Sequence, residues 1–144
     1  PAVLVYYCDG MGSSVTILAV DDNEAHRYFV CRALEQAGFR AIAVGDGAST
    51  LELARERPDL VLLDACLPDM SGFEVCRRLK SNAATSKIPI VMFSAISQSG
   101  SAVNDAMQLG AAGFLFFPMS AEQLVAVVNG SLSRTTQDSH SRSV

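Results

Sequence analysis

Residues 15–20 read Val-Thr-Ile-Leu-Ala-Val and are followed directly by Asp21 and Asp22, while residues 60–63 read Leu-Val-Leu-Leu and are followed directly by Asp64. Near-continuous aliphatic runs of this length are typical of strands buried on both faces of a parallel sheet. The carboxyl ends of such strands form the rim of the ligand crevice in an open α/β sheet, so acidic side chains placed there converge. The two stretches therefore predict a parallel sheet with an acidic site at one edge.

The rest of the chain alternates between short apolar runs and segments of helical period. The expected strands are residues 16–20, 40–44, 59–63, 88–93 and 113–116, and the expected helices are residues 24–37, 48–57, 72–79, 97–109 and 122–132. Parallel strands need crossover connections, which helices supply. Five strand-then-helix units predict one α/β domain over residues 15–132, with a doubly wound, five-stranded parallel sheet.

The two ends carry weaker patterns. Residues 1–14 form an N-terminal extension, in which a short apolar stretch precedes the flexible joint Gly-Met-Gly-Ser-Ser. An expression remnant, an extra edge strand and a partner contact all remain open for it. Residues 133–144 are polar and lack apolar periodicity, so we expect a disordered tail there.

Composition excludes several function classes. The net charge is -4 and the Lys and Arg residues are scattered, so we expect no nucleic-acid binding by this chain. The four cysteines show no Cys-x-x-Cys spacing, which argues against a zinc site or a disulfide framework and fits reduced thiols in the cytoplasm. No apolar run approaches the roughly 18 residues that a membrane span needs.

Three carboxylates gathered at one edge need a counter-cation. Mg2+ is the hard, oxygen-seeking choice, and it is usually held by one or two carboxylates, carbonyls and waters, with phosphate oxygens completing the octahedron. Asp21, Asp22 and Asp64 therefore predict a site that pairs Mg2+ with a phosphoryl group.

Four motifs lie in order at the ends of the first, third, fourth and fifth strands. They are Ala-Val-Asp-Asp-Asn at 19–23, Asp-Ala-Cys-Leu-Pro-Asp-Met-Ser-Gly at 64–72, Phe-Ser-Ala at 93–95 and Phe-Leu-Phe-Phe-Pro at 114–118. Together they resemble the receiver domain of two-component response regulators, over about residues 15–132. The resemblance implies a flavodoxin-like sheet in the strand order 2-1-3-4-5.

The resemblance also assigns roles at the acidic site. It implies that Asp64 accepts a phosphoryl group from a histidine kinase or a phosphotransfer protein. Asp22 would be a direct Mg2+ ligand, Asp21 would act mainly through water, and Cys66 would offer its backbone carbonyl.

Four further residues take their roles from the same resemblance. Ser94 matches the switch hydroxyl that moves to the phosphoryl group, and its neighbour Ala95 leaves space for the phosphate. Phe114 matches the aromatic side chain that turns inward with that hydroxyl. Pro118 lies where the family commonly has a cis peptide.

One position departs from the family pattern. The family has a lysine directly before that proline, and this chain has Phe117. A phenyl ring cannot donate a charge-assisted hydrogen bond, so one phosphoryl oxygen loses a partner worth roughly 1.5 to 3 kcal/mol. We expect metal binding to survive this change and coupling of phosphorylation to a conformational switch to weaken.

Simpler interpretations remain for single residues. Asp22 or Asn23 could cap the helix that begins near Glu24, and Ser94 could be an ordinary turn hydroxyl. His26 lies early in that helix and is expected to be a surface residue. Phe116 is expected to be a plain core or rim aromatic.

The resulting function is signalling rather than enzymatic. The first hypothesis is a receiver that is phosphorylated on Asp64 with Mg2+ and then binds a downstream protein, or a second copy, through helix 97–109, strand 113–116 and helix 122–132. The alternative is a phosphorylation-independent interaction module that uses the same face. A small Mg2+-dependent phosphatase is a third candidate, but the sequence shows no second catalytic set.

Overall fold

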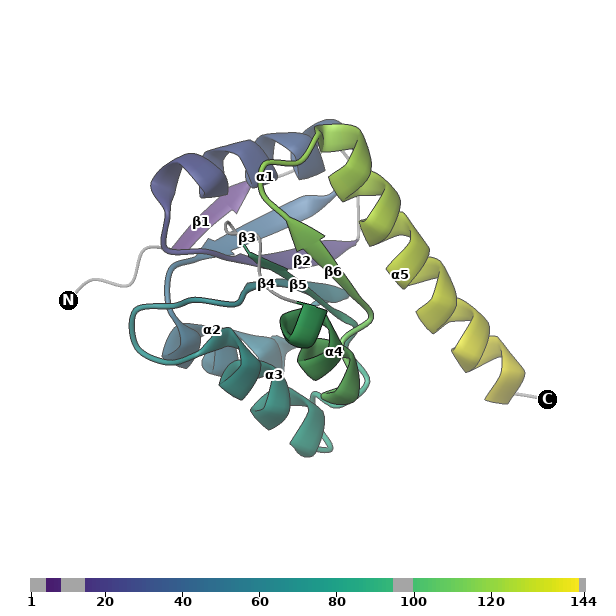
Figure 1. Ribbon diagram of the computed structural model, residues 1–144. Coiled ribbons are helices and arrows are strands. Elements are labelled where there is room, and N and C mark those ends of the chain that lie inside the picture. Colours follow the sequence, from purple (N-terminus) through teal and green to yellow (C-terminus); the bar gives the residue numbers. More distant parts are fainter. Residues whose placement is uncertain (1–4, 9–14, 95–99, 143–144) are drawn as a thin grey trace.

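A six-stranded sheet forms the middle layer of the molecule in the computed structural model, which describes residues 5–8, 15–94 and 100–142 (Figure 1). Its order is β1-β3-β2-β4-β5-β6. The strands are β1 (Val5–Cys8), β2 (Thr16–Val20), β3 (Arg40–Val44), β4 (Leu60–Asp64), β5 (Ile90–Ser94) and β6 (Gly113–Phe116).

Five of these strands confirm the expected fold class. β3, β2, β4, β5 and β6 are all parallel, and their order is the expected 2-1-3-4-5. The register pairs Val20 of β2 with Leu63 of β4, so Asp21, which follows β2, and Asp64, which ends β4, lie at the same edge of the sheet. The sheet thus delivers the acidic residues to one place.

The sixth strand, β1, comes from the N-terminal extension. It pairs with β3 antiparallel, from Val5 opposite Val44 to Cys8 opposite Ala41. Of the three interpretations left open for residues 1–14, the structure supports the extra edge strand for residues 5–8. β1 covers the backbone groups along the outer side of β3, which would otherwise be an unpaired edge.

Helices cover both faces of the sheet. α1 (Glu24–Gln36) and α5 (Ala121–Arg142) lie on one face, and α2 (Gly47–Leu53), α3 (Gly72–Ser81) and α4 (Gly100–Gln108) lie on the other (Figure 1). A short 3-10 helix, Ala54–Glu56, follows α2. Leu34 of α1 and Leu124 of α5 belong to one apolar core, and Leu79 of α3 belongs to the other.

The expectation of a disordered tail over residues 133–144 is wrong for most of that segment. α5 continues to Arg142 and projects past the sheet (Figure 1). Starting a helix is costly, whereas adding residues to an existing one costs little. Leu124 and Val128 anchor the first turns in the core, and the polar residues extend the helix from there.

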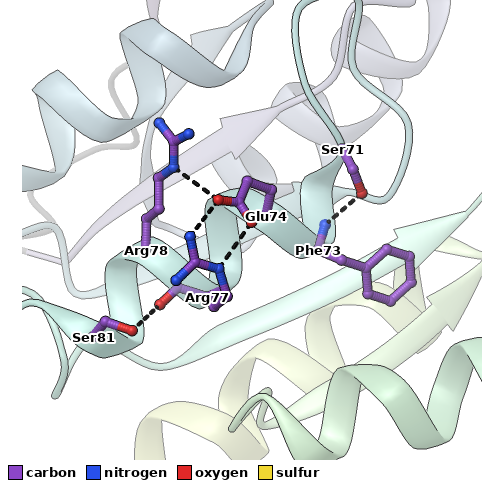
Figure 2. Close-up of polar contacts among 6 residues, drawn as sticks. All are labelled: Ser71, Phe73, Glu74, Arg77, Arg78 and Ser81. Carbon is purple, nitrogen blue, oxygen red and sulfur yellow. Dashed lines mark hydrogen bonds and ion pairs between the residues drawn. The ribbon is translucent and has the colours of Figure 1, made fainter.

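α3 begins close to the acidic edge and has a well-defined start. The Ser71 side chain caps it by accepting a hydrogen bond from the Phe73 backbone N–H at 3.1 Å. On the exposed side, Glu74 accepts hydrogen bonds from Arg77 and Arg78 (Figure 2). The cap fixes where the loop after β4 must end.

Candidate functional site

Asp21, Asp22 and Asp64 come together at the carboxyl ends of β2 and β4. One oxygen from each carboxylate can be chosen so that all three lie within 4.8 Å of one another. Asp21 is 2% exposed and Asp64 is 9% exposed, while Asp22 faces solvent. The structure therefore brings together the three acids that the sequence indicated.

Asp21 is held at both carboxylate oxygens. Its Oδ1 accepts a hydrogen bond from the Asn23 backbone N–H at 2.9 Å, and its Oδ2 lies 3.0 Å from Nδ1 of His26. The buried Arg27 donates from Nη1 to the Asp21 backbone carbonyl at 2.9 Å. The chain therefore fixes both the main chain and the side chain of this residue.

Asp64 lies in an unfavourable environment for a charge. Burial raises its pKa to about 7, the Cys66 backbone N–H acts against this by donating to Oδ1 at 3.1 Å, and the carboxylates of Asp21 and Asp22 raise the pKa further. Near neutral pH the cluster therefore holds a proton or needs a cation. Carboxylates with this arrangement fit a hard divalent cation such as Mg2+.

Cys66 and Gly72 flank the loop that follows Asp64. Cys66 is exposed, and its backbone is tied to Asp64 by the hydrogen bond just described. Gly72 packs directly against the main chain of β4, since a Cβ atom built there would lie 2.0 Å from the Asp64 carbonyl oxygen. The loop can close over the acid only because this position has no side chain.

Ser94 ends β5 beside the acidic edge. It is buried, its carbonyl accepts a hydrogen bond from the Phe117 N–H at 2.8 Å, and the register places Phe93 opposite Asp64. Ala95 lies outside the described residues, so its expected role stays a prediction.

Phe117 is packed rather than left on the surface. Its ring stacks on the His26 imidazole with centroids 4.3 Å apart and planes 6° apart. It also makes edge contacts with Phe29 and Phe93, at 5.9 and 5.4 Å. The peptide between Phe117 and Pro118 is cis, as expected at this position.

Phe114 lies in β6, before Phe117 in the chain. It is partly buried against the core under α3 and α4, and its ring centroid is 5.1 Å from that of Phe116. Phe116 itself is exposed, so the core interpretation is wrong and the rim interpretation holds.

His26 is the site residue that the sequence analysis missed. The expectation of a plain surface residue is wrong, because its side chain is only 26% exposed and contacts both Asp21 and Phe117. Asn23 caps α1 by accepting from the His26 N–H at 3.0 Å, which settles the capping question in favour of Asn23. Side chains lean toward the start of a helix, so a first-turn residue after an acidic pair was a usable signal.

Comparison with known proteins places this doubly wound fold and acidic edge in one family. The model of the response regulator receiver domain matches residues 17–129, and the chain belongs to this family. Among curated proteins it is 38% identical to the DNA-binding response regulator MtrA of Mycobacterium leprae over 123 residues, which are 85% of this chain and 53% of that one. The chain thus spans about half the length of the curated relatives it matches.

Solved structures agree on the fold. A putative response regulator from Chloroflexus aurantiacus has a TM-score of 0.79 and 27% identity, over 84% of this chain and 99% of that one. The receiver domain of the sensor histidine kinase PA1611 from Pseudomonas aeruginosa, solved with a magnesium ion in its active-site cleft, has a TM-score of 0.77 and 24% identity over 84% and 99%. Among the described residues, no helix combines the length and apolarity that crossing a membrane requires.

Proposed function

We propose that this receiver domain accepts a phosphoryl group on Asp64 from a histidine kinase or a phosphotransfer protein in the cytoplasm. The observation that carries the proposal is the cluster of Asp21, Asp22 and Asp64 at the carboxyl ends of β2 and β4. A carboxylate oxygen of Asp64 would attack phosphorus, and the bond from phosphorus to the donor histidine nitrogen would break, leaving its electron pair on nitrogen.

Mg2+ is the cofactor in this proposal. Asp21, Asp22, Asp64 and the Cys66 carbonyl would hold it, and it would neutralise charge on the phosphoryl oxygens. The high pKa of Asp64, caused first by burial, supports a site that is incomplete without positive charge. The magnesium-bound receiver domain of PA1611 gives a precedent within the same fold.

The output surface in this proposal is formed by α4, β6 and α5. Ser94 would reach the phosphoryl group and Phe114 would turn inward with it. Met107 of α4 and Phe116 of β6 are exposed apolar side chains on these elements, which suits contact with a downstream protein or a second copy. That this chain itself does not bind nucleic acid stays a prediction, although MtrA is DNA-binding by name.

A phosphorylation-independent interaction module is the second candidate. The packing of Phe117 favours it, because the ring is held by His26, Phe29 and Phe93 and offers no charge to a phosphoryl group. The acidic cluster favours the first candidate. Both candidates use the same fold, so phosphorylation itself must be measured.

Incubating the protein with a small phosphodonor and Mg2+ should add the mass of one phosphoryl group. Asp64→Asn is the matched control, because the amide keeps the shape and the acceptor for the Cys66 N–H but is not a nucleophile. Intact mass spectrometry reads the result. A mass gain that persists in Asp64→Asn would mean that another residue carries the phosphoryl group, and it would contradict the proposal. No gain in the unaltered protein at high donor concentration would favour the second candidate.

Phe117→Lys tests the departure from the family pattern. We expect tighter partner or self-association on phosphorylation, because a lysine there supplies the missing cation, worth roughly 1.5 to 3 kcal/mol. Loss of the three ring contacts should lower the free energy of unfolding by about 2 kcal/mol. Phe117→Leu, which loses the ring without gaining charge, controls for packing. If phosphorylation strengthens partner or self-association equally in the unaltered protein, Phe117→Lys and Phe117→Leu, position 117 does not limit the switch.

A further inference from the structure

We propose that His26 is a positioning residue for Mg2+, which acts by holding the Asp21 carboxylate in one orientation while the Phe117 ring holds His26. The inference depends on the proposed metal site and adds to it a residue on α1. The side chains of His26 and Asp21 are 26% and 3% exposed, so the contact between them is largely shielded from water.

The hydrogen bonds of Asp21 leave little freedom to the carboxylate. The Asn23 N–H lies 2.9 Å from Oδ1 and His26 Nδ1 lies 3.0 Å from Oδ2, and the side chain also interacts with the Asp64 carboxyl group. A carboxylate that binds a metal ion only accepts hydrogen bonds, so the proposal requires the hydrogen of the imidazole to lie on Nδ1. A carboxylate oxygen has two lone pairs, so a hydrogen bond to one of them is compatible with a metal ion or a metal-bound water at the other.

Phe117 fixes the imidazole in turn. The two rings are nearly parallel at a centroid distance of 4.3 Å, and Phe117 is wedged against Phe93 of β5 and Phe29 of α1. A flat side chain at position 117 offers His26 a face on which to stack. Phe117 stands in the place of the family's lysine and so removes a cation from the site. The same residue supports His26, which contacts the Asp21 carboxylate.

Partners of metal-binding carboxylates affect metal affinity even though they never touch the ion. Removing such an outer partner typically lowers affinity by about 10-fold to 100-fold. Without His26, Oδ2 of Asp21 would lose its donor and the buried carboxylate could rotate about the Asn23 contact. We expect the loss of Mg2+ affinity to fall at the lower end of this range, because the Asn23 N–H still donates to Oδ1.

Two variants separate the effect of the hydrogen-bond donor on Mg2+ binding from the effect of the stacked ring. His26→Phe keeps a ring that can stack on Phe117 but has no N–H, and His26→Asn keeps a donor near the place of Nδ1 but has no ring. Measured by calorimetric titration with Mg2+ alone, His26→Phe should bind about 10-fold more weakly than the unaltered protein. His26→Asn should recover most of the affinity. Urea unfolding in the absence of metal shows whether each variant is folded.

Spectroscopy gives a readout that a merely structural role would not move. Long-range 1H–15N spectra show which ring nitrogen carries the hydrogen, and His140 is the only other histidine in the chain. We expect Nδ1–H for His26, and a shift of its ring signals on addition of Mg2+. A hydrogen on Nε2 alone, or a folded His26→Phe that binds Mg2+ as tightly as the unaltered protein, would overturn the inference.

The outcomes distinguish this inference from the proposed function. Phosphorylation of Asp64 together with unchanged Mg2+ affinity in His26→Phe defeats only the role of His26. The expected order of affinities without any phosphoryl mass gain defeats only the phosphoacceptor role of Asp64. Absence of Mg2+ binding by the unaltered protein defeats the inference and the metal site together.

Discussion

Gly72→Ala should unfold at much lower urea concentration than the unaltered protein, with a loss of about 3 kcal/mol or more in the free energy of unfolding. The added Cβ would lie 2.0 Å from the Asp64 carbonyl oxygen and 2.9 Å from Cα of Ala65. Both are main-chain atoms, so no side chain can rotate away and β4 must separate from α3. Because Asp64 belongs to the displaced segment, Mg2+ binding should weaken as well.

Gly130→Ala is the matched control. Gly130 lies inside α5, is exposed, and has no neighbouring atom within 4 Å of an added Cβ. Alanine favours a helix over glycine by up to about 1 kcal/mol, so this variant should be slightly more stable than the unaltered protein. If both variants unfold at the same urea concentration, glycine at position 72 is not required for the close approach of α3 to β4.

Hydrophobic pattern alone was enough to place most of the sheet. β2, β3 and β6 begin and end at the residues expected from the sequence. β4 and β5 begin at Leu60 and Ile90, later than the expected residues 59 and 88, and end one residue later than expected, at Asp64 and Ser94. Backbone pairing continues through Asp64 and Ser94, opposite Phe93 and Phe116. A run of apolar residues indicates which side chains are buried. It does not show where backbone hydrogen bonds between strands continue into polar residues.

Features that depend on distant partners were harder to predict. The apolar residues of β1 fit several interpretations, because their pairing with β3 crosses more than thirty positions of the chain. The continuation of α5 to Arg142 follows from anchoring of its first turns, which the tail composition does not show. The acids were found from strand ends and the family motifs, but His26 joins them only through the geometry of α1.

Stability of the metal-free protein should fall as pH rises from about 4 to about 7. The ordinary pKa of an aspartic acid is near 3.8, while burial and the neighbouring acids raise the pKa of Asp64 to about 7 in the folded protein. Between these values the unfolded chain has released a proton that the folded chain retains. The free energy of unfolding therefore decreases with pH in this window and levels off above it.

The size of this change follows from the width of the window. At about 1.4 kcal/mol for each pKa unit, the loss is on the order of up to 4 kcal/mol. Asp64→Asn should remove most of the decline, so it should match the unaltered protein at pH 4 and exceed it at pH 8. Asp105→Asn, which changes an exposed carboxylate on α4, should keep the decline. Urea unfolding across the pH range measures all three.

Mg2+ should oppose the same decline, because a cation and a proton compete for one cluster of oxygens. A ligand that binds only the folded state stabilises it by about 2.7 kcal/mol when its concentration is 100 times its Kd. This stabilisation should be present at pH 8 and should vanish near pH 5, where the cluster already holds its proton. Mg2+ should stabilise Asp64→Asn much less, because asparagine has no carboxyl group that could carry a negative charge or bind a proton. Equal stabilisation of the two proteins by Mg2+ at pH 8 would mean that the ion binds elsewhere, and that the raised pKa of Asp64 reflects burial without a metal site.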